Sequence, residues 1–258
     1  MTNLGVQRKI LILELLASDG QVLAKDLSER FGVSEDSIRR DLRDLSKEGL
    51  LQRVHGGALP ASAAVAPFRR RTTLDTTAKQ ALATAALALL RPGQILLIDG
   101  GTTCAELVRQ IPRDLALTVV THSPSIAVEL VDHPRVEVIM LGGQLFKHSI
   151  VNLGAATVEA MAHIRADLFF MGVTGVHPTE GLSTGHLEEA HIKRALAARA
   201  AETVVMASKS KLNAASSYTI GQLGLIQTLV LEADSSPALI REFQAAGLSV
   251  VLAAAPPP

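Results

Sequence analysis

The stretch that decides the fold of the first part of the chain is FGVSEDSIRRDLRDL, residues 31–45. Ser34 is suited to cap a helix whose first turn holds two acidic residues, which the helix dipole favours. Ile38, Leu42 and Leu45 follow at spacings of four and three residues, so they share one face of that helix. The stretch therefore predicts a helix with one buried apolar stripe and a polar, charged opposite face.

Two further helical patterns precede this helix, and a hairpin pattern follows it. Residues 8–17 are rich in leucine and isoleucine, and residues 24–31 form a second, shorter helical pattern. Residues 50–58, LLQRVHGGA, predict two short strands joined by a turn. Helices joined by a tight turn and followed by a hairpin are the arrangement of a winged helix-turn-helix. We predict such a DNA-binding domain over residues 5–60, with the helix-turn-helix at about residues 22–41.

The polar face of the third helix and the hairpin supply the candidate DNA contacts. A helix that enters the major groove needs small polar residues near its N-terminus and arginines that reach bases or phosphates. An ordinary solvent-exposed helix carries similar residues in pairs such as Arg40–Asp44, so the helix alone does not decide between the two interpretations. The neighbouring helix, turn and basic wing favour DNA binding. The predicted contacts are Ser34, Ser37, Arg39, Arg40, Arg43, Arg53 and His55.

The pattern changes beyond this region. Residues 61–77 combine prolines, alanines and the arginine triplet 69–71 without periodicity, and they are predicted to be a linker. Over residues 78–254, apolar strand patterns alternate with helical ones, which is typical of a Rossmann-like α/β domain with a parallel sheet covered on both faces. The expected strands are 95–98, 117–120, 136–141, 168–171, 203–207, 228–231 and 249–253.

The composition restricts the class of protein. The 258 residues include 25 Lys and Arg and 25 Asp and Glu, so DNA binding has to come from local pattern and not from a basic surplus. One cysteine and the lack of an HExxH motif argue against a disulfide or a zinc site, and we expect no metal and no cofactor. No apolar run reaches the roughly 18 residues that span a membrane, and no secretory leader is evident, so we expect a cytoplasmic protein.

Polar loops follow several of the predicted strands of the α/β domain. Residues 99–103, DGGTT, lie between a strand and a helix, where glycines allow close backbone approach and free N–H groups attract an anion. Such a turn is common, and the polar loops at other strand ends favour a ligand site because ligands of open α/β sheets bind there. The predicted effector-binding residues are Asp99, Gly100, Gly101, Thr102, Thr103, His122, Ser123, Gly143, Lys147, Gly172, Thr174, Glu189, Lys193 and Lys211.

Two of these features have simpler interpretations. Glu189 and Lys193 are four residues apart and could form an ordinary ion pair on a helix surface. Cys104 lies in the first turn of the helix that follows the DGGTT loop, where a thiol can have a lowered pKa. A small packed residue is the favoured interpretation of Cys104.

Motifs spread over nearly the whole chain, roughly residues 5–232, match one known family. They are RKILILELL at 8–16, the run from Val22 to Ala58 that ends in QRVHGGA, then Phe68, Arg71 and Lys79, and the later IDGGTT, VVTHS, LGG, MGVTG, EAHIK and SKL. In these motifs the chain resembles the DeoR family of bacterial transcription regulators. The resemblance implies a sensor domain that is related to ribose-5-phosphate isomerase and binds phosphorylated sugars or similar metabolites. Lys211 matches a family lysine near the effector phosphate, whereas Ser208 stands where the family commonly has Asp.

The resemblance implies a transcription regulator, in most cases a repressor of a carbohydrate-metabolism operon, that binds double-stranded operator DNA. One winged helix contacts few base pairs, so we expect a homo-oligomer, dimer or tetramer, that reads two half-sites. An isomerase-like phosphosugar enzyme with a DNA-binding domain and an architectural DNA-binding protein are the alternatives. Isomerase relatives place acidic residues in a loop that here, at residues 171–176, contains none, so we expect no catalytic residue.

Overall fold

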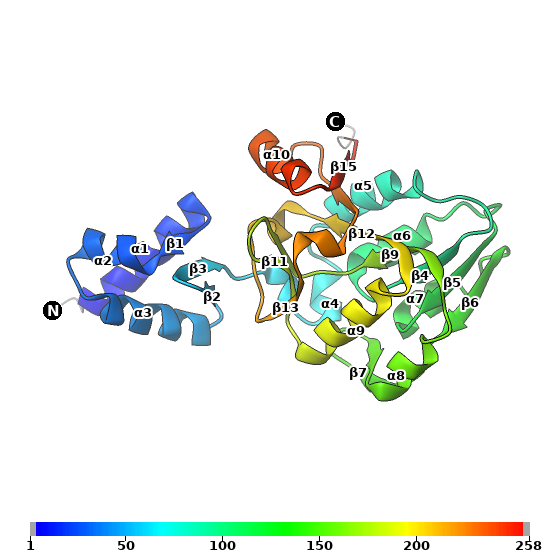
Figure 1. Cartoon of the computed structure of the whole chain (residues 1–258), viewed down its shortest axis with the longest axis horizontal. Helices are drawn as coiled ribbons and strands as arrows, with labels where there is room; N and C mark the ends of the chain where they lie inside the picture. Colours follow the sequence, from blue (N-terminus) through cyan, green and yellow to red (C-terminus); the bar gives the residue numbers. More distant parts are fainter. Residues whose placement is uncertain (1–3, 255–258) are drawn as a thin grey trace.

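The computed structural model describes residues 4–254, which form two lobes (Figure 1). The first lobe is a winged helix-turn-helix, as predicted. Its three strands form an antiparallel sheet in the order β1-β3-β2. The elements of this lobe are α1 (Leu4–Asp19), β1 (Val22–Leu23), α2 (Ala24–Phe31), α3 (Glu35–Lys47), β2 (Leu51–Val54) and β3 (Gly57–Pro60).

Ion pairs hold α1 against α3 beside the apolar core of this lobe. Arg8 Nε donates to Asp41 at 2.5 Å, and Lys9 Nζ donates to Asp44 at 2.8 Å. The surface pair between Arg40 and Asp44, which the alternative interpretation of an ordinary exposed helix implies, does not form, because Asp44 is bonded to Lys9 from a different helix. Arg40 is consequently left exposed on α3. The core itself consists of Ile12, Leu16, Val22, Ala24, Leu27, Ile38, Leu42, Leu45, Leu51 and Ala58.

The two glycines of the hairpin, Gly56 and Gly57, are each required for a different physical reason. Gly56 has φ 77° at the turn between β2 and β3, a conformation that L side chains rarely adopt. Gly57 begins β3 opposite β1, where a Cβ would lie 1.9 Å from the carbonyl oxygen of Val22. The Gly-Gly pair therefore makes the turn and permits the close pairing of β3 with β1.

The second lobe is built on a seven-stranded sheet in the order β15-β14-β12-β9-β4-β5-β6, in which every pair of neighbours is parallel. All the strands expected from the apolar patterns are present, and the predicted α/β class is confirmed. The strands are β4 (Ile95–Ile98), β5 (Leu117–Thr121), β6 (Val136–Met140), β9 (Ala166–Met171), β12 (Ala200–Ala207), β14 (Thr228–Leu231) and β15 (Ser249–Leu252).

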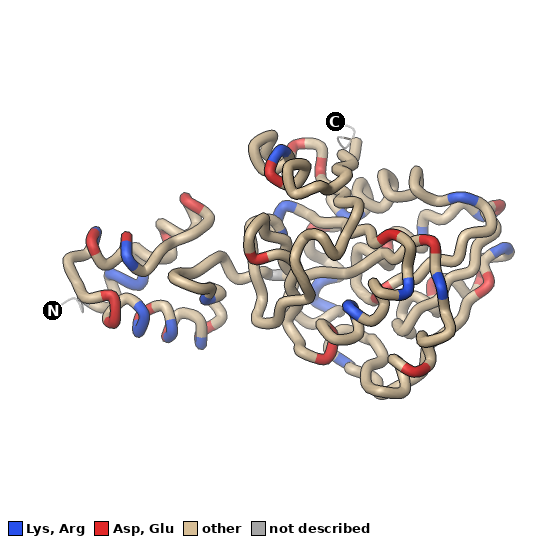
Figure 2. The backbone as a smooth tube through the Cα atoms, in the orientation of Figure 1, with Lys and Arg blue, Asp and Glu red and all other residues tan. Residues whose placement is uncertain are grey.

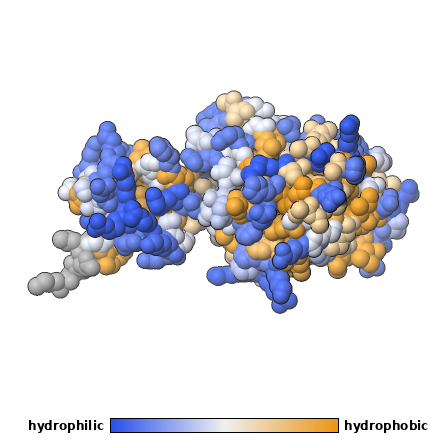
Figure 3. Space-filling model, turned by 60° about the horizontal axis from the view of Figure 1, so that its bottom comes forward, coloured by the Kyte–Doolittle hydropathy of each residue, from blue (hydrophilic) through white to orange (hydrophobic). Residues whose placement is uncertain are grey.

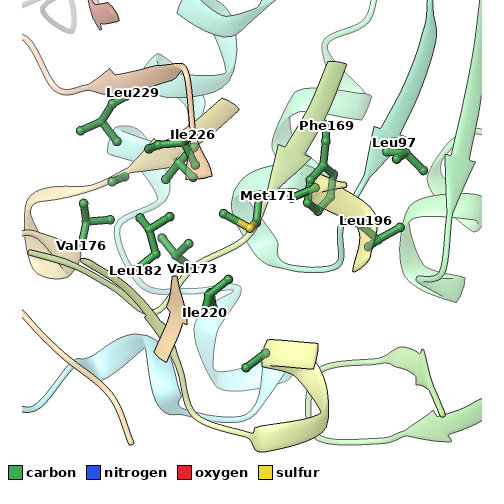
Figure 4. Packing of buried hydrophobic residues seen from close by; sticks show 14 of the residues in the cluster. Leu97, Phe169, Met171, Val173, Val176, Leu182, Leu196, Ile220, Ile226 and Leu229 are labelled. Carbon is green, nitrogen blue, oxygen red and sulfur yellow. The ribbon is translucent and has the colours of Figure 1, made fainter. Parts of the chain in front are cut away.

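Helices cover both faces of this sheet. Leu96 and Ile98 of β4 pack into one buried cluster, whereas Leu97 between them packs into the other, together with Phe169 of β9 (Figure 4). The first cluster lies under α5 (Thr76–Leu87), α6 (Thr102–Arg109) and α7 (Pro124–Glu129). The second includes residues of α9 (Leu187–Ala197) and α10 (Pro237–Ala245) and lies beside α8 (Ala155–Ala160).

Short strands outside the main sheet were not expected from the sequence. β7 (Gln144–Phe146) pairs with β8 (Val151–Leu153), and β11 (Gly181–Thr184) lies between β10 (Gly175–His177) and β13 (Tyr218–Gly221). Each has three or four residues, too few for a clear alternating pattern. Three short 3₁₀ turns also occur, η1 (Ala63–Val65), η2 (Lys209–Lys211) and η3 (Leu223–Leu225).

The interdomain segment, residues 61–77, is attached to the α/β lobe along its length. Ala61 forms a bridge with Ala215, and the buried Ser62 hydroxyl donates to the carbonyl oxygen of Thr174. Farther along, α4 (Phe68–Arg71) begins with a hydrogen bond from the Phe68 amide to the His148 carbonyl at 2.8 Å. The segment is therefore part of the wall of the second lobe. Within residues 4–254, no helix is both long and apolar enough to cross a membrane.

Candidate functional site

The predicted DNA-contacting residues lie on α3 and on the hairpin. Ser34 caps α3, and its hydroxyl accepts a hydrogen bond from the Ser37 amide at 3.3 Å. Arg39 is paired with Glu35 on the same helix at 2.7 Å. Arg40 and Arg43 are exposed and form no ion pair within 4.0 Å with any described carboxylate, and Arg53 and His55 are exposed on the wing. Basic residues recur along α3 (Figure 2), and the winged-helix lobe presents a largely hydrophilic face (Figure 3).

A cavity of about 340 Å³ lies at the carboxyl ends of the central strands of the second lobe. It is lined by the strand-end loops, by α9 and η2, and by the interdomain segment. The loops after β4 and β9 come together here because these strands are neighbours in the sheet. The predicted effector residues that line it are Gly100, Gly101, Thr102, Thr103, Gly172, Thr174, Glu189, Lys193 and Lys211.

Asp99 forms the buried base of the site. Its side chain is 1% exposed, and it accepts hydrogen bonds from the amides of Gly100 at 2.7 Å and Gly172 at 2.8 Å. It also accepts from the ammonium of Lys193. Lys193 is thus paired with Asp99 and not with Glu189, so the interpretation of Glu189 and Lys193 as an ordinary helix pair is wrong. Asp99 ties the two glycine loops and α9 together beneath the cavity.

Five of the predicted residues, Asp99 beneath the cavity and four others, lie outside the cavity lining. His122 is buried beside Asp99, with 3.3 Å between its Nε2 and Asp99 Oδ1, and burial lowers the pKa of its imidazole to about 4, so it is neutral at pH 7. The Ser123 hydroxyl donates to the Ile150 carbonyl at 2.8 Å. Gly143 and Lys147 are exposed in the β7 region. These residues support or flank the strand-end loops.

Cys104 occupies a buried position in the first turn of α6. Its burial raises the pKa of the thiol to about 12, which is opposite to the lowering that a helix N-terminus can produce. The thiol is therefore protonated at neutral pH, and the interpretation of Cys104 as a small packed residue agrees with the structure.

The sequence patterns did not place the interdomain segment in the site. Arg71, Leu74 and Asp75 line the cavity, and Lys79 follows on α5. A signal was present for Lys79, because it shares the apolar face of α5 with buried residues three, four and seven positions later, and it is only 5% exposed. Arg71 stood out only through the family resemblance, and no local pattern marked Leu74 or Asp75, because their neighbours in the cavity are distant in sequence.

Asp75 places a carboxylate next to η2. Its Oδ2 accepts hydrogen bonds from the hydroxyls of Ser210 at 2.6 Å and Ser208 at 3.2 Å. The resemblance noted from the sequence implies Asp where this chain has Ser208. In this chain, the carboxylate of Asp75 from the interdomain segment therefore lies next to the side chain of Ser208.

The charges around the cavity leave one lysine without a partner. Lys79 donates to the carbonyl oxygens of Arg71 at 2.6 Å and of Leu74, and Lys193 is paired with Asp99. Lys211 is 8% exposed, and its ammonium has no hydrogen bond or ion pair with any residue the structure describes. Burial and the nearby Arg71 lower the pKa of Lys211 to about 8, so the amine is mostly protonated at pH 7. A buried cation without a partner favours an anionic ligand.

Two family models together cover most of the chain. Residues 8–63 match the DeoR-like helix-turn-helix domain, and residues 74–233 match the DeoR C-terminal sensor domain. The chain belongs to the DeoR family. As in that family, a DNA-binding helix-turn-helix is joined to a sensor domain. Among residues 4–254, no group of three or more His, Cys, Asp or Glu side chains is arranged to hold a metal ion.

Relatives over nearly the full length support the same assignment. The HTH-type transcriptional regulator GlpR of Haloferax volcanii is 34% identical over 255 residues, which cover 96% of this chain and 98% of the relative. The glycerol-3-phosphate regulon repressor of Escherichia coli K12 is 28% identical over 228 residues, 88% of this chain and 90% of the relative. This DeoR-family protein is accordingly a transcriptional regulator and not an enzyme.

The chain has a partial structural likeness to a solved enzyme. Ribose 5-phosphate isomerase A from Methanocaldococcus jannaschii is 18% identical, with a TM-score of 0.41, over 54% of this chain and 55% of the enzyme chain.

Proposed function

We propose that this DeoR-family protein is a repressor of a carbohydrate-metabolism operon and that a phosphorylated sugar or related metabolite, bound in the cavity, controls its affinity for operator DNA. The winged helix reads the operator through the exposed face of α3 and through the wing. The cavity reads the metabolite. Support for repression, as opposed to activation, comes from relatives such as the E. coli glycerol-3-phosphate regulon repressor.

The observation that carries the proposal is that the unpaired Lys211 ammonium lines the same cavity as a glycine turn at a helix N-terminus. Gly101 has φ 125° and immediately precedes α6, whose first residues are Thr102 and Thr103. Free amides at a helix N-terminus and a nearby ammonium are the groups that bind phosphate. The volume, about 340 Å³, is at the lower end of the range for small-molecule pockets. A phosphorylated metabolite satisfies both the unpaired cation and the free amides.

The test is DNA-binding anisotropy with the promoter upstream of the protein's own operon as the probe. Glycerol 3-phosphate, ribose 5-phosphate, hexose phosphates and inorganic phosphate are titrated against the preformed complex, and each unphosphorylated parent compound is the matched control. We expect at least one phosphorylated compound to change the DNA affinity while its parent does not. A response to a parent compound alone, or to none of the panel, contradicts a phosphate-binding effector site.

Arg40→Ala is expected to weaken binding of the cognate operator by about 1–3 kcal/mol, because an arginine that reads a base makes a bidentate contact of that size. Arg40 is exposed and has no described carboxylate partner to restrain it. The measurement is anisotropy on cognate and scrambled DNA, with Arg135→Ala, an exposed arginine of the α/β lobe, as the control. Equal weakening on both DNAs would assign Arg40 to phosphate contacts, and unchanged affinity on both would contradict the α3 interface.

We also propose that the protein acts as a homo-oligomer. Two half-sites about 34–36 Å apart are needed for regulatory specificity, and one winged helix reads only one of them. Apolar side chains are available for self-association on the edge strand β6 and nearby, where Ile139, Met140, Val128 and Val131 are 41–74% exposed. Figure 3 shows apolar residues gathered on one face of this lobe. Sedimentation at micromolar concentration should give a dimer or tetramer; a monomer, both free and on DNA, would contradict this.

A further inference from the structure

Arg71 is carried into the cavity by the interdomain segment. Its helix, α4, is fixed at both ends: the Phe68 amide donates to the His148 carbonyl at 2.8 Å, and Lys79 donates to the carbonyl of Arg71 itself at 2.6 Å. Of the three consecutive arginines on this helix, Arg69 and Arg70 are exposed, whereas Arg71 lines the cavity. The backbone thus directs one arginine of the triplet inward.

The partly buried guanidinium of Arg71 has no protein partner for its charge among the described residues. Its Nε is buried and has no hydrogen-bond partner among the described residues, and no carboxylate of those residues lies within 4.0 Å of it. One face lies over the Phe68 ring, with 5.8 Å between Cζ and the ring centroid. Its Nη1 is 3.9 Å from the point that a Cβ on Gly101 would occupy. The guanidinium therefore lies against the glycine turn that begins α6.

The position of the Arg71 guanidinium suits an anion bound between the interdomain segment and the α/β lobe. The planar guanidinium donates two parallel hydrogen bonds to phosphate or carboxylate oxygens. Lys211 is the second cation of the cavity without a described partner, and after burial the positive charge of Arg71 is the largest cause that lowers the pKa of Lys211. An anion here would be bound by Lys211 and the α6 amides from the α/β lobe and by Arg71 from the interdomain segment.

The same segment continues directly into the wing. Ser62, which follows β3, donates through its hydroxyl to the carbonyl of Thr174, a residue of the cavity lining. Ala64 and Val65 also line the cavity, and Val65 packs against Gly185, where a Cβ would lie 2.9 Å from its Cγ1. Residues 62–65 therefore connect the lining of the cavity directly to β3, the strand by which the winged helix is attached.

We propose that Arg71 is a ligand of the effector's anionic group and that this contact transmits occupancy of the cavity to the winged helix through residues 61–75. The inference rests on the proposed function, since it assumes an anionic effector in this cavity. The bound anion closes the segment onto the sensor core and sets the position of the wing. An effector changes DNA affinity only through interactions that differ between two states, and the Arg71 contact supplies such a difference.

The test uses the full chain and the phosphorylated compound of the panel above that acts on wild type. Arg71→Gln removes the charge, Arg71→Lys keeps it without the fork, and Arg70→Gln on the same helix is the matched control. Calorimetry should show binding weakened about tenfold to hundredfold in Arg71→Gln, less in Arg71→Lys, and not at all in Arg70→Gln. Operator affinity without the compound should equal that of wild type in all three, which also shows that they are folded.

Two further measurements examine transmission. At compound concentrations that saturate each variant, Arg71→Gln should show little change in operator affinity, while Arg70→Gln responds as wild type does. Amide hydrogen exchange over residues 61–75 should slow on binding in wild type and in Arg70→Gln, but not in Arg71→Gln. Ser62→Ala should keep the affinity for the compound within about twofold but reduce its effect on DNA binding, because the hydroxyl tie to Thr174 is lost.

The outcomes separate the two proposals. If wild type binds no phosphorylated compound, including inorganic phosphate, the proposed effector site is wrong. If wild type binds and responds, but Arg71→Gln has the same affinity and the same DNA response, the Arg71 proposal alone is overturned. Weakened binding with a full DNA response at saturation would leave Arg71 as a ligand and overturn its role in transmission.

Discussion

Gly101→Asp is expected to lower the affinity for the phosphorylated effector about a thousandfold. Like unit charges near 4 Å repel by about 4 kcal/mol at an effective dielectric of 20, and each 1.4 kcal/mol corresponds to about tenfold in affinity. A side chain at Gly101 also occupies the turn before α6, and its carboxylate would meet Arg71, whose Nη1 is 3.9 Å from the new Cβ. The substitution therefore adds a negative charge where the anion is bound and removes a cation from it.

Gly101→Asn is the matched control for this prediction. It has the same size and the same backbone strain at φ 125° but no charge, so it should weaken effector binding much less than Asp. Calorimetric titration of the effector into both variants measures the difference. Operator affinity without effector should persist, because the DNA contacts lie in the winged helix, and the Asp variant should remain on DNA at effector concentrations that release wild type. Equal release of wild type and both variants would show that this turn is not the phosphate site.

Asp99→Ala is expected to lower the free energy of unfolding of the α/β lobe by about 3–5 kcal/mol, the cost of leaving one member of a buried ion pair without its partner. Lys193 is 5% exposed and has Asp99 as its hydrogen-bonded carboxylate. The amides of Gly100 and Gly172 lose their acceptor in the same variant. Urea denaturation of the full chain, followed through the transition of this lobe, measures the loss.

The control is Asp234→Ala, which removes another Lys–Asp pair. Lys209 and Asp234 are hydrogen-bonded, but their side chains are 46% and 73% exposed, so water replaces the lost partner. We expect no measurable change in the denaturation midpoint for this variant. A similarly small change for Asp99→Ala would mean that Lys193 reaches solvent or another partner when Asp99 is removed.

Much of the candidate site could be read from short stretches of sequence because its loops follow strands that are apolar throughout. The DGGTT turn after β4 and the MGVTG loop after β9 each stand out locally, and adjacent parallel strands bring them to one edge. The ion-pair partners of the charged residues in the site could not be predicted from local sequence. Lys193 is four residues from Glu189 but pairs with Asp99, which is 94 residues away, because α9 packs with that edge of the sheet.

Local pattern by itself determined that this chain has a winged helix-turn-helix followed by a parallel α/β domain. Helix caps, apolar stripes and strand runs depend on neighbours a few residues apart, so they are visible in the sequence. The role of residues 61–77 was decided only by tertiary structure. Their composition predicts a linker, yet Ser62 is bonded to Thr174, 112 residues away, and Asp75 to Ser210, 135 residues away. Such contacts depend on the folded sheet, because only the sheet brings these distant residues together. The cavity that Arg71 lines at the edge of the sheet exists for the same reason.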